Sequence, residues 1–186
     1  MNVTLELNPR EAFKPFLHSD KRWACIVAHR RAGKTFAVIQ KLIKTAFELK
    51  RPGPPPRFAY IAPTLDQARD IAWAYLKDFL SPIPQVQVNQ SSLTITLPNR
   101  STIRLYSGDN YERLRGIYLD GCVIDEPSDI PAAAWSQVIR PCLSDYQGFA
   151  WFIGTPKGKN SFYKRHIQAQ ESDEWHSALI RASDSG

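Results

Sequence analysis

Long apolar runs are missing from this chain of 186 residues, and so are internal repeats and low-complexity segments. No stretch approaches the roughly 20 consecutive apolar residues that a membrane-spanning helix needs. Residues 1–3 begin no signal peptide, since neither a basic start nor an apolar core follows. These absences argue against a membrane or secreted protein. They predict a protein that works in a cytoplasm, its own or that of a host cell.

Cysteine is scarce and has no metal-binding pattern. The three cysteines are an odd number, and none of them forms a C-x-x-C pair. Cys25 and Cys122 lie in apolar runs that read as strands, so we expect buried free thiols in a reducing compartment. A disulfide framework and a cysteine metal site are both disfavoured.

Acidic residues are outnumbered, with 18 Asp and Glu against 24 Lys and Arg, which gives a net charge of +6. This excess mildly favours a polyanionic partner, although solubility alone can produce it. The basic residues gather in two places: Lys21, Arg22, Arg30, Arg31 and Lys34 early in the chain, and Lys157, Lys159, Lys164 and Arg165 late in it. The first group could serve nucleotide phosphates. The second could contact a DNA backbone or form a solvated helix face.

The hydrophobic pattern alternates between strands and helices, and it indicates one domain over residues 1–186. Apolar runs predict buried strands at residues 23–27, 58–62, 121–124 and 149–153, and alternation predicts another at 175–182. Helical periodicity predicts helices at residues 36–49, 65–79, 131–139 and 160–171, with a short turn at 112–116. Alternating runs at 86–88, 93–97 and 102–106 predict antiparallel strands on one flank. The fold class is therefore α/β, a three-layer and mainly parallel sheet with an antiparallel flank.

The stretch from Ala28 to Thr35 stands between a predicted strand and a predicted helix. In this order, backbone N–H groups and the helix N-terminus face phosphate oxygens, Lys34 reaches the β- and γ-phosphates, and the Thr35 hydroxyl holds Mg²⁺. A phosphate-binding loop usually has a glycine where this chain has Ala28. The alternative is a basic surface turn that happens to contain Gly-Lys-Thr. The candidate nucleotide-binding residues are His29, Arg30, Arg31, Ala32, Gly33, Lys34, Thr35 and Phe36.

Asp125 and Glu126 follow a buried strand and supply the other half of a nucleotide site. Asp125 can orient Mg²⁺ beside Thr35, which we expect on the loop of the neighbouring strand. Glu126 is then placed to polarise a water for attack on the γ-phosphate. The alternative is a helix start that uses acidic residues near its N-terminus.

Phosphoryl transfer also needs positive charge on the developing oxygens, and Arg30, Arg31 and Arg115 are the candidates. Each of them could instead be an ordinary surface arginine. Thr155 follows the strand at 149–153 and could sense the γ-phosphate. The alternative for Thr155 is a turn that simply ends this strand.

Taken together, these motifs resemble the large subunits of tailed-phage terminases, and the resemblance covers essentially the whole chain. The motifs occur in the family's order: Arg-Arg-Ala-Gly-Lys-Thr at 30–35, Ala-Pro-Thr at 62–64 with Gln-Ala at 67–68, Leu-Arg-Gly at 114–116, Val-Ile-Asp-Glu at 123–126 and Gly-Thr-Pro-Lys-Gly at 154–158. The resemblance implies a RecA-like (ASCE) P-loop ATPase that uses ATP and Mg²⁺. It implies Lys34 and Thr35 on phosphate and metal, Asp125 on the metal, and Glu126 as the catalytic carboxylate.

The resemblance also implies that Thr155 couples hydrolysis to movement, that Arg30 or Arg31 acts within the subunit, and that Arg115 reaches the ATP of a neighbour. The implied partners are double-stranded DNA, further copies of the chain in a homo-oligomeric ring, the portal protein and the small terminase subunit. The location would be the host cytoplasm, with transient docking on the procapsid.

The family's second domain is a nuclease with a carboxylate-bound metal cluster, and nothing after Gly154 supplies such a cluster, so we expect no DNA cleavage by this chain. Two other functions fit the same motifs: the first motor domain of a helicase, and a nucleotide-gated scaffold that binds DNA or a portal without hydrolysis. For contact with the base, Phe16 and His18 are candidates, although packing of a short helix against the sheet is the favoured interpretation for Phe16, since single aromatic residues usually belong to the core.

Overall fold

An eight-stranded sheet in the order β3-β4-β5-β2-β6-β7-β1-β8 forms the middle layer of the computed structural model, which describes residues 8–184. The start of the chain, where we expect no signal peptide, lies outside the described residues. The strands are β1 (Trp23–Ala28), β2 (Arg57–Ala62), β3 (Gln87–Asn89), β4 (Thr94–Thr96), β5 (Thr102–Ser107), β6 (Gly121–Asp125), β7 (Phe149–Gly154) and β8 (Trp175–Ile180). Among these residues, no helix is long and apolar enough to cross a membrane.

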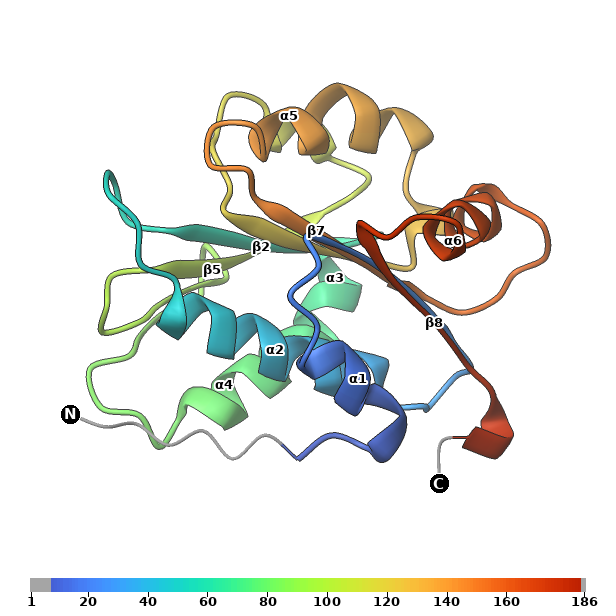
Figure 1. Ribbon diagram of the computed structural model, residues 1–186. Helices are drawn as coiled ribbons and strands as arrows, with labels where there is room; N and C mark the ends of the chain where they lie inside the picture. Colours follow the sequence, from blue (N-terminus) through green and yellow to red (C-terminus); the bar gives the residue numbers. More distant parts are fainter. Residues whose placement is uncertain (1–7, 185–186) are drawn as a thin grey trace.

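Helices cover both faces of the sheet, which gives the three layers expected from the sequence (Figure 1). One face carries α1 (Lys14–Leu17), α2 (Lys34–Glu48) and a continuous helix made of α3 (Leu65–Gln67), the π-helical η2 (Ala68–Trp73) and α4 (Ala74–Leu80). The other face carries η5 (Ala134–Ile139), which continues into α5 (Arg140–Cys142), and α6 (Ser161–Gln170). The short 3₁₀ turns are η1 (Glu11–Phe13), η3 (Tyr111–Leu114), η4 (Pro127–Asp129) and η6 (Ala182–Asp184). The helix predicted at 131–139 thus extends to Cys142.

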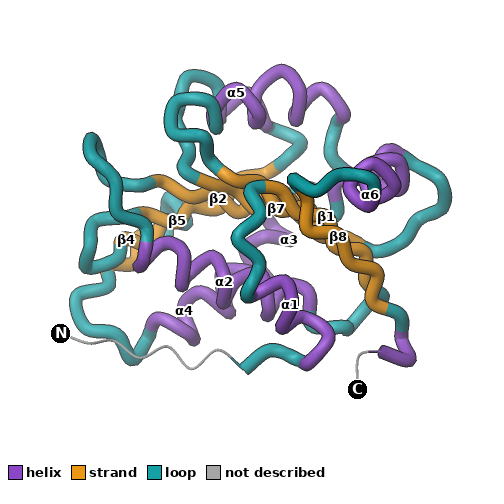
Figure 2. Tube along the Cα trace, viewed as in Figure 1, coloured by secondary structure: helices purple, strands orange, loops and turns teal. Residues whose placement is uncertain are grey.

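Six strands of the sheet run parallel, so the loops at their carboxyl ends lie at one edge of the sheet. Figure 2 shows the strands (orange) as the layer between the helices (purple). The flank formed by β3 and β4 is antiparallel, as predicted. The antiparallel prediction for residues 102–106 is half wrong, because β5 is antiparallel to β4 but parallel to β2. Alternation shows only that a strand is half-buried, and it does not show the direction of the partner on each side.

The buried side of α2 fixes the position of the loop before it. Its apolar residues recur at helical spacing and face the sheet: Ala37, Val38, Ile39, Leu42, Ile43 and Ala46. A Leu42→Ala change would leave a cavity there and cost about 2–5 kcal/mol. Because this face is fixed to the sheet, the N-terminus of α2 lies at the edge where β1 ends.

The three cysteines are buried free thiols, as the sequence predicts. Burial raises the pKa of the Cys25 thiol to about 12, so it stays protonated and unreactive.

Candidate active site

The loop after β1 begins where Ala28 ends the strand. Ala28 is fully buried and pairs with Ile180 of β8. Its backbone is therefore extended, a conformation that does not require glycine. Gly33, at the N-cap of α2, has φ 95°, a conformation that glycine adopts without strain. The glycine that the loop requires is therefore Gly33, and alanine is compatible with position 28.

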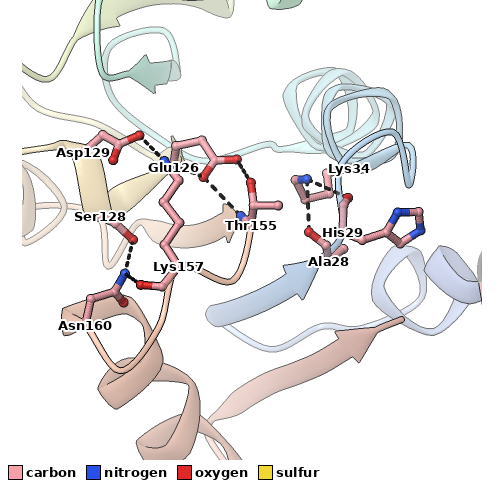
Figure 3. Close-up of polar contacts among 9 residues, drawn as sticks. All are labelled: Ala28, His29, Lys34, Glu126, Ser128, Asp129, Thr155, Lys157 and Asn160. Atoms are coloured by element: carbon pink, nitrogen blue, oxygen red, sulfur yellow. Dashed lines mark hydrogen bonds and ion pairs between the residues drawn. The ribbon is translucent and has the colours of Figure 1, made fainter. Parts of the chain in front are cut away.

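Lys34 lies folded over the loop that precedes it (Figure 3). Its Nζ atom donates to the carbonyl oxygens of Ala28 at 3.2 Å and His29 at 3.1 Å. Burial lowers the pKa of Lys34, and the carboxylates of Glu126 and Asp125 oppose this effect. The amino group and the N-terminus of the 15-residue helix α2 thus gather donors and positive potential at one point.

A cavity of about 530 Å³ opens beside this loop, within the usual size range of small-molecule sites. Its walls are Asn8, Arg10, Arg31, Gly33, Lys34, Thr35, Phe36, Ile71 and Tyr75. Phe36 packs edge-on against Tyr75, with ring centroids 5.7 Å apart. The cavity therefore joins a basic end at the loop to an apolar end formed by the helix that follows β2.

Arg10 is a wall residue that no sequence motif indicates. Its guanidinium donates to the carbonyl oxygen of Arg31 at 3.2 Å, which fastens the segment before α1 to the loop. No local motif marks Arg10, because the contact joins segments 21 residues apart. Phe16, by contrast, is 2% exposed and packs against Trp151, so it belongs to the core and does not line the cavity; neither does His18, whose side chain is exposed.

Asp125, the last residue of β6, is partly buried and hydrogen-bonded. The Tyr60 hydroxyl donates to its Oδ2 at 2.5 Å, and the Thr35 side chain lies close enough to this phenol to act against the rise of its pKa. Burial raises the pKa of Asp125 to about 6, while the bond from Tyr60 acts to lower it. One phenol thus lies beside both candidate metal ligands, Thr35 and Asp125.

These ligands fit Mg²⁺ held together with a nucleotide. Within residues 8–184, no three or more His, Cys, Asp or Glu residues form a metal-binding group by themselves. Mg²⁺ is commonly bound by one or two protein oxygens with phosphates and waters completing its shell. The Thr35 hydroxyl and the Asp125 carboxylate supply that kind of partial oxygen set.

Glu126 has an unusual backbone and a firmly held side chain. Its φ is 46° and ψ is 57°, a left-handed conformation that costs a non-glycine residue about 1–3 kcal/mol and is frequent at functional sites. Its carboxylate accepts hydrogen bonds from the backbone N–H of Thr155 at 3.1 Å and from the Thr155 hydroxyl (Figure 3). The strained turn therefore directs the carboxylate toward the end of β7.

The expected position of Asp125 relative to the loop needs a correction. We expected the loop and the acidic pair on neighbouring strands, but β7 lies between β1 and β6. In the pairing register, Val27 of β1 is opposite Gly154, and Asp125 is opposite Ile153. Thr155 therefore lies at the end of the central strand of the three, between the two halves of the site.

The late basic cluster is divided between the surface and the core: Lys157, Lys159 and Lys164 are exposed, whereas Arg165 is half-buried. Lys157 pairs with Asp129, and its Nζ lies 3.8 Å from Glu126. The Arg165 guanidinium stacks over the Phe152 ring at 4.0 Å, and burial lowers its pKa. Lys159 and Lys164 remain exposed.

The three candidate arginines occupy different places. Arg31 lines the cavity, and Arg30 lies near enough to Lys34 and Lys157 for its charge to act against protonation of both. Arg115 is exposed at the end of η3 and donates to Glu112 at 2.7 Å. The structure therefore brings Arg30 and Arg31 to the loop and places Arg115 on a different part of the surface.

Comparisons with known proteins agree with this geometry. Residues 25–181 match the family described as "Terminase large subunit, T4likevirus-type, N-terminal". The large terminase subunits of Thermus phage G20c and Thermus virus P23-45 are each 33% identical over 164 residues, which is 77% of this chain and 32% of theirs. The chain thus spans about a third of the length of these relatives.

Solved structures share the fold. The large terminase ATPase domain of Thermus phage P74-26 is 26% identical, with a TM-score of 0.80 over 95% of this chain and 82% of that one. The large terminase of the thermophilic bacteriophage D6E, solved with ADP, is 20% identical, with a TM-score of 0.78 over 95% of this chain and 46% of that one. These likenesses confirm the expected RecA-like α/β fold. The chain belongs to the family of phage terminase large subunits, and it matches their N-terminal ATPase domain.

Proposed function

We propose that this domain hydrolyses ATP with Mg²⁺ and that the hydrolysis drives double-stranded viral DNA into a procapsid. The observation that carries the proposal is the meeting of Lys34, Asp125, Glu126 and Thr155 at one edge of the sheet, beside the cavity. The ADP complex of the D6E protein and the name of the P74-26 domain support the same reading.

Each residue has a role in this proposal. Lys34 and the N–H groups at the start of α2 bind the phosphates, while Thr35 and Asp125 would hold Mg²⁺. The ion, when bound, neutralises charge on the β- and γ-phosphates. Glu126 orients and polarises the attacking water, and Thr155 holds that carboxylate in place. Arg30 or Arg31 stabilises the charge that develops on the transferred group.

The wider assembly is part of the same proposal. Identical subunits would form a ring in the host cytoplasm, docked on the procapsid through the portal and supplied with DNA by the small terminase subunit. Arg115 would then leave Glu112 and reach the ATP of a neighbouring subunit. Its exposed position at the end of η3, away from the loop of its own chain, supports a role in trans.

Steady-state hydrolysis and nucleotide binding test the activity. We expect Lys34→Ala to abolish binding, and Glu126→Gln to bind ATP normally but turn over about 10²–10⁴-fold more slowly. Lys164→Ala, an exposed change on α6, is the matched control and should retain the wild-type rate. Wild-type turnover in the Lys34 or Glu126 variant contradicts the proposal. Tight binding without turnover, even in oligomers with DNA, supports the scaffold alternative.

Mixed oligomers test the arginine. Arg115→Ala subunits alone should be slow, and adding Glu126→Gln subunits, which keep Arg115, should partly restore hydrolysis. Arg113→Ala, two residues earlier, is the control, and it should hydrolyse ATP at the wild-type rate without added subunits. If the mixture is as slow as Arg115→Ala alone under assembling conditions, the trans role fails.

A further inference from the structure

Tyr60 is an unusual residue in its strand. β2 is a buried run with alanine, phenylalanine and isoleucine around a single phenol, and Tyr60 is 1% exposed. A buried tyrosine hydroxyl needs a hydrogen-bond partner. Here it donates to Asp125 Oδ2 at 2.5 Å, and the Thr35 side chain lies close to it.

The register of the sheet explains why the side chain at position 60 reaches this point. Tyr60 lies opposite Val123 of β6, and both face α2. Asp125 is two residues beyond Val123, so it points to the same face at about 6.6 Å further along the strand. A tyrosine that leans along the strand can span that distance with its hydroxyl, whereas a serine or threonine at position 60 would be too short.

The hydrogen bond has only one possible direction. The phenol has one proton, and a carboxylate oxygen can only accept it, so Tyr60 is the donor and Asp125 Oδ2 is the acceptor. A buried donor on a fixed strand therefore holds one oxygen of the Asp125 carboxylate, and the Thr35 side chain lies close to the same phenol.

We propose that Tyr60 is a positioning residue of the magnesium site, which holds the Asp125 carboxylate in a fixed position beside Thr35 before the nucleotide and its metal bind. The proposal rests on the proposed ATPase function. It goes beyond that function because Tyr60 lies on β2, which carries neither the phosphate loop nor the acidic pair. Its role is to act through Asp125, without contact to the phosphates.

The test is Tyr60→Phe, which keeps the ring and removes only the hydroxyl. A fluorescent ATP analogue is titrated in EDTA and again in a series of Mg²⁺ concentrations. In EDTA, we expect the variant to bind the nucleotide with unchanged affinity. With Mg²⁺, we expect the variant to need about a tenfold higher Mg²⁺ concentration to reach half of the gain in nucleotide affinity. Losses of this size are typical when a hydrogen-bond partner of a metal ligand is removed. Tyr106→Phe on β5 removes a tyrosine hydroxyl beside Arg104 and should leave the Mg²⁺ response unchanged.

A double-mutant cycle separates positioning from packing. In an Asp125→Asn background, Tyr60→Phe should have little further effect on the Mg²⁺ response, because its target is already changed. An undiminished effect in that background, or a normal Mg²⁺ response in Tyr60→Phe alone, overturns the proposal even if the variant is less stable. If instead the wild-type domain neither binds nor hydrolyses ATP, the proposed function itself fails.

Discussion

Thr155 donates two hydrogen bonds to the carboxylate of Glu126, one from its backbone N–H at 3.1 Å and one from its hydroxyl. The backbone bond goes to Oε2 and the hydroxyl bond to Oε1, so both oxygens are held. Together with the left-handed turn at Glu126, this pair fixes the orientation of the Glu126 carboxylate. The end of β7 is therefore coupled directly to the candidate catalytic group.

Thr155→Val should lower the turnover number about tenfold and leave KM unchanged. The change removes the hydroxyl bond to a charged group, worth about 1.5 kcal/mol, and keeps the backbone bond and the side-chain shape. Thr155→Ser restores the hydroxyl and should retain most of the wild-type rate in a steady-state assay. A valine variant with a wild-type turnover number, or a serine variant as slow as valine, contradicts the role.

Arg10→Ala should raise the Kd for ATP several-fold, about 1 kcal/mol for one lost hydrogen bond and part of a cavity wall. Arg10 lines the cavity and is bound to the carbonyl oxygen of Arg31, so its loss loosens the loop. The control is Lys14→Ala, because Lys14 is exposed and pairs only locally with Glu11. If the Arg10 variant and the wild type bind ATP with equal affinity in a calorimetric titration, Arg10 does not contribute to nucleotide binding.

Arg165→Ala should lower the free energy of unfolding by about 1–2 kcal/mol in urea denaturation. The guanidinium stacks on Phe152 at 4.0 Å and on Trp135 at 5.2 Å, so its loss removes packing from the face that α6 covers. Lys164→Ala, its exposed neighbour, should change stability by less than about 0.5 kcal/mol. If both variants are equally stable, Arg165 is not part of the core.

The buried ammonium group of Lys41 should make the free energy of unfolding depend on pH. Its Nζ is bound to the carbonyl oxygens of Phe16 and Ser19 at 2.5 Å each, and burial lowers its pKa to about 8. Between pH 8 and 10.5 the native state loses this proton while the unfolded state keeps it, so the unfolded state binds more protons. Stability relative to a Lys41→Met variant should therefore rise over that range, by up to about 3 kcal/mol.

Denaturant unfolding of wild type and Lys41→Met at pH 7, 8, 9 and 10 measures this difference. Other groups titrate in both proteins, so their effects largely cancel in the comparison. A difference in unfolding free energy that stays constant from pH 7 to 10 would show that the ammonium group is not destabilised by burial.

Much of the frame follows from local sequence patterns. Buried parallel strands are continuous apolar runs, so β1, β2, β6 and β7 could be predicted to within a residue or so. Ligands in such sheets bind at the carboxyl ends of the strands, and this rule was enough to predict that Thr35, Asp125 and Thr155 would converge.

What the sequence did not reveal depends on pairing between distant segments. The place of β7 between β1 and β6 follows from strand order, which no single run of residues encodes. Tyr60 looked like one more core residue, because Asp125, to which it donates, lies on β6. Arg165 looked like a surface charge, because its contact with Phe152 depends on how α6 packs against β7. For Phe16, packing was the favoured interpretation over contact with the base, and its burial confirms it.

The central position of β7 has a consequence for how this site can change over evolutionary time. Two ladder spacings, about 9.6 Å, separate β1 from β6, and that distance is a property of backbone hydrogen bonding. Point substitutions can change the side chains at the end of either strand, but they do not change the distance between the two strands. Proteins that share this fold with only a fifth to a third of their residues identical can therefore keep the same distance between the two strands while the side chains at their ends differ.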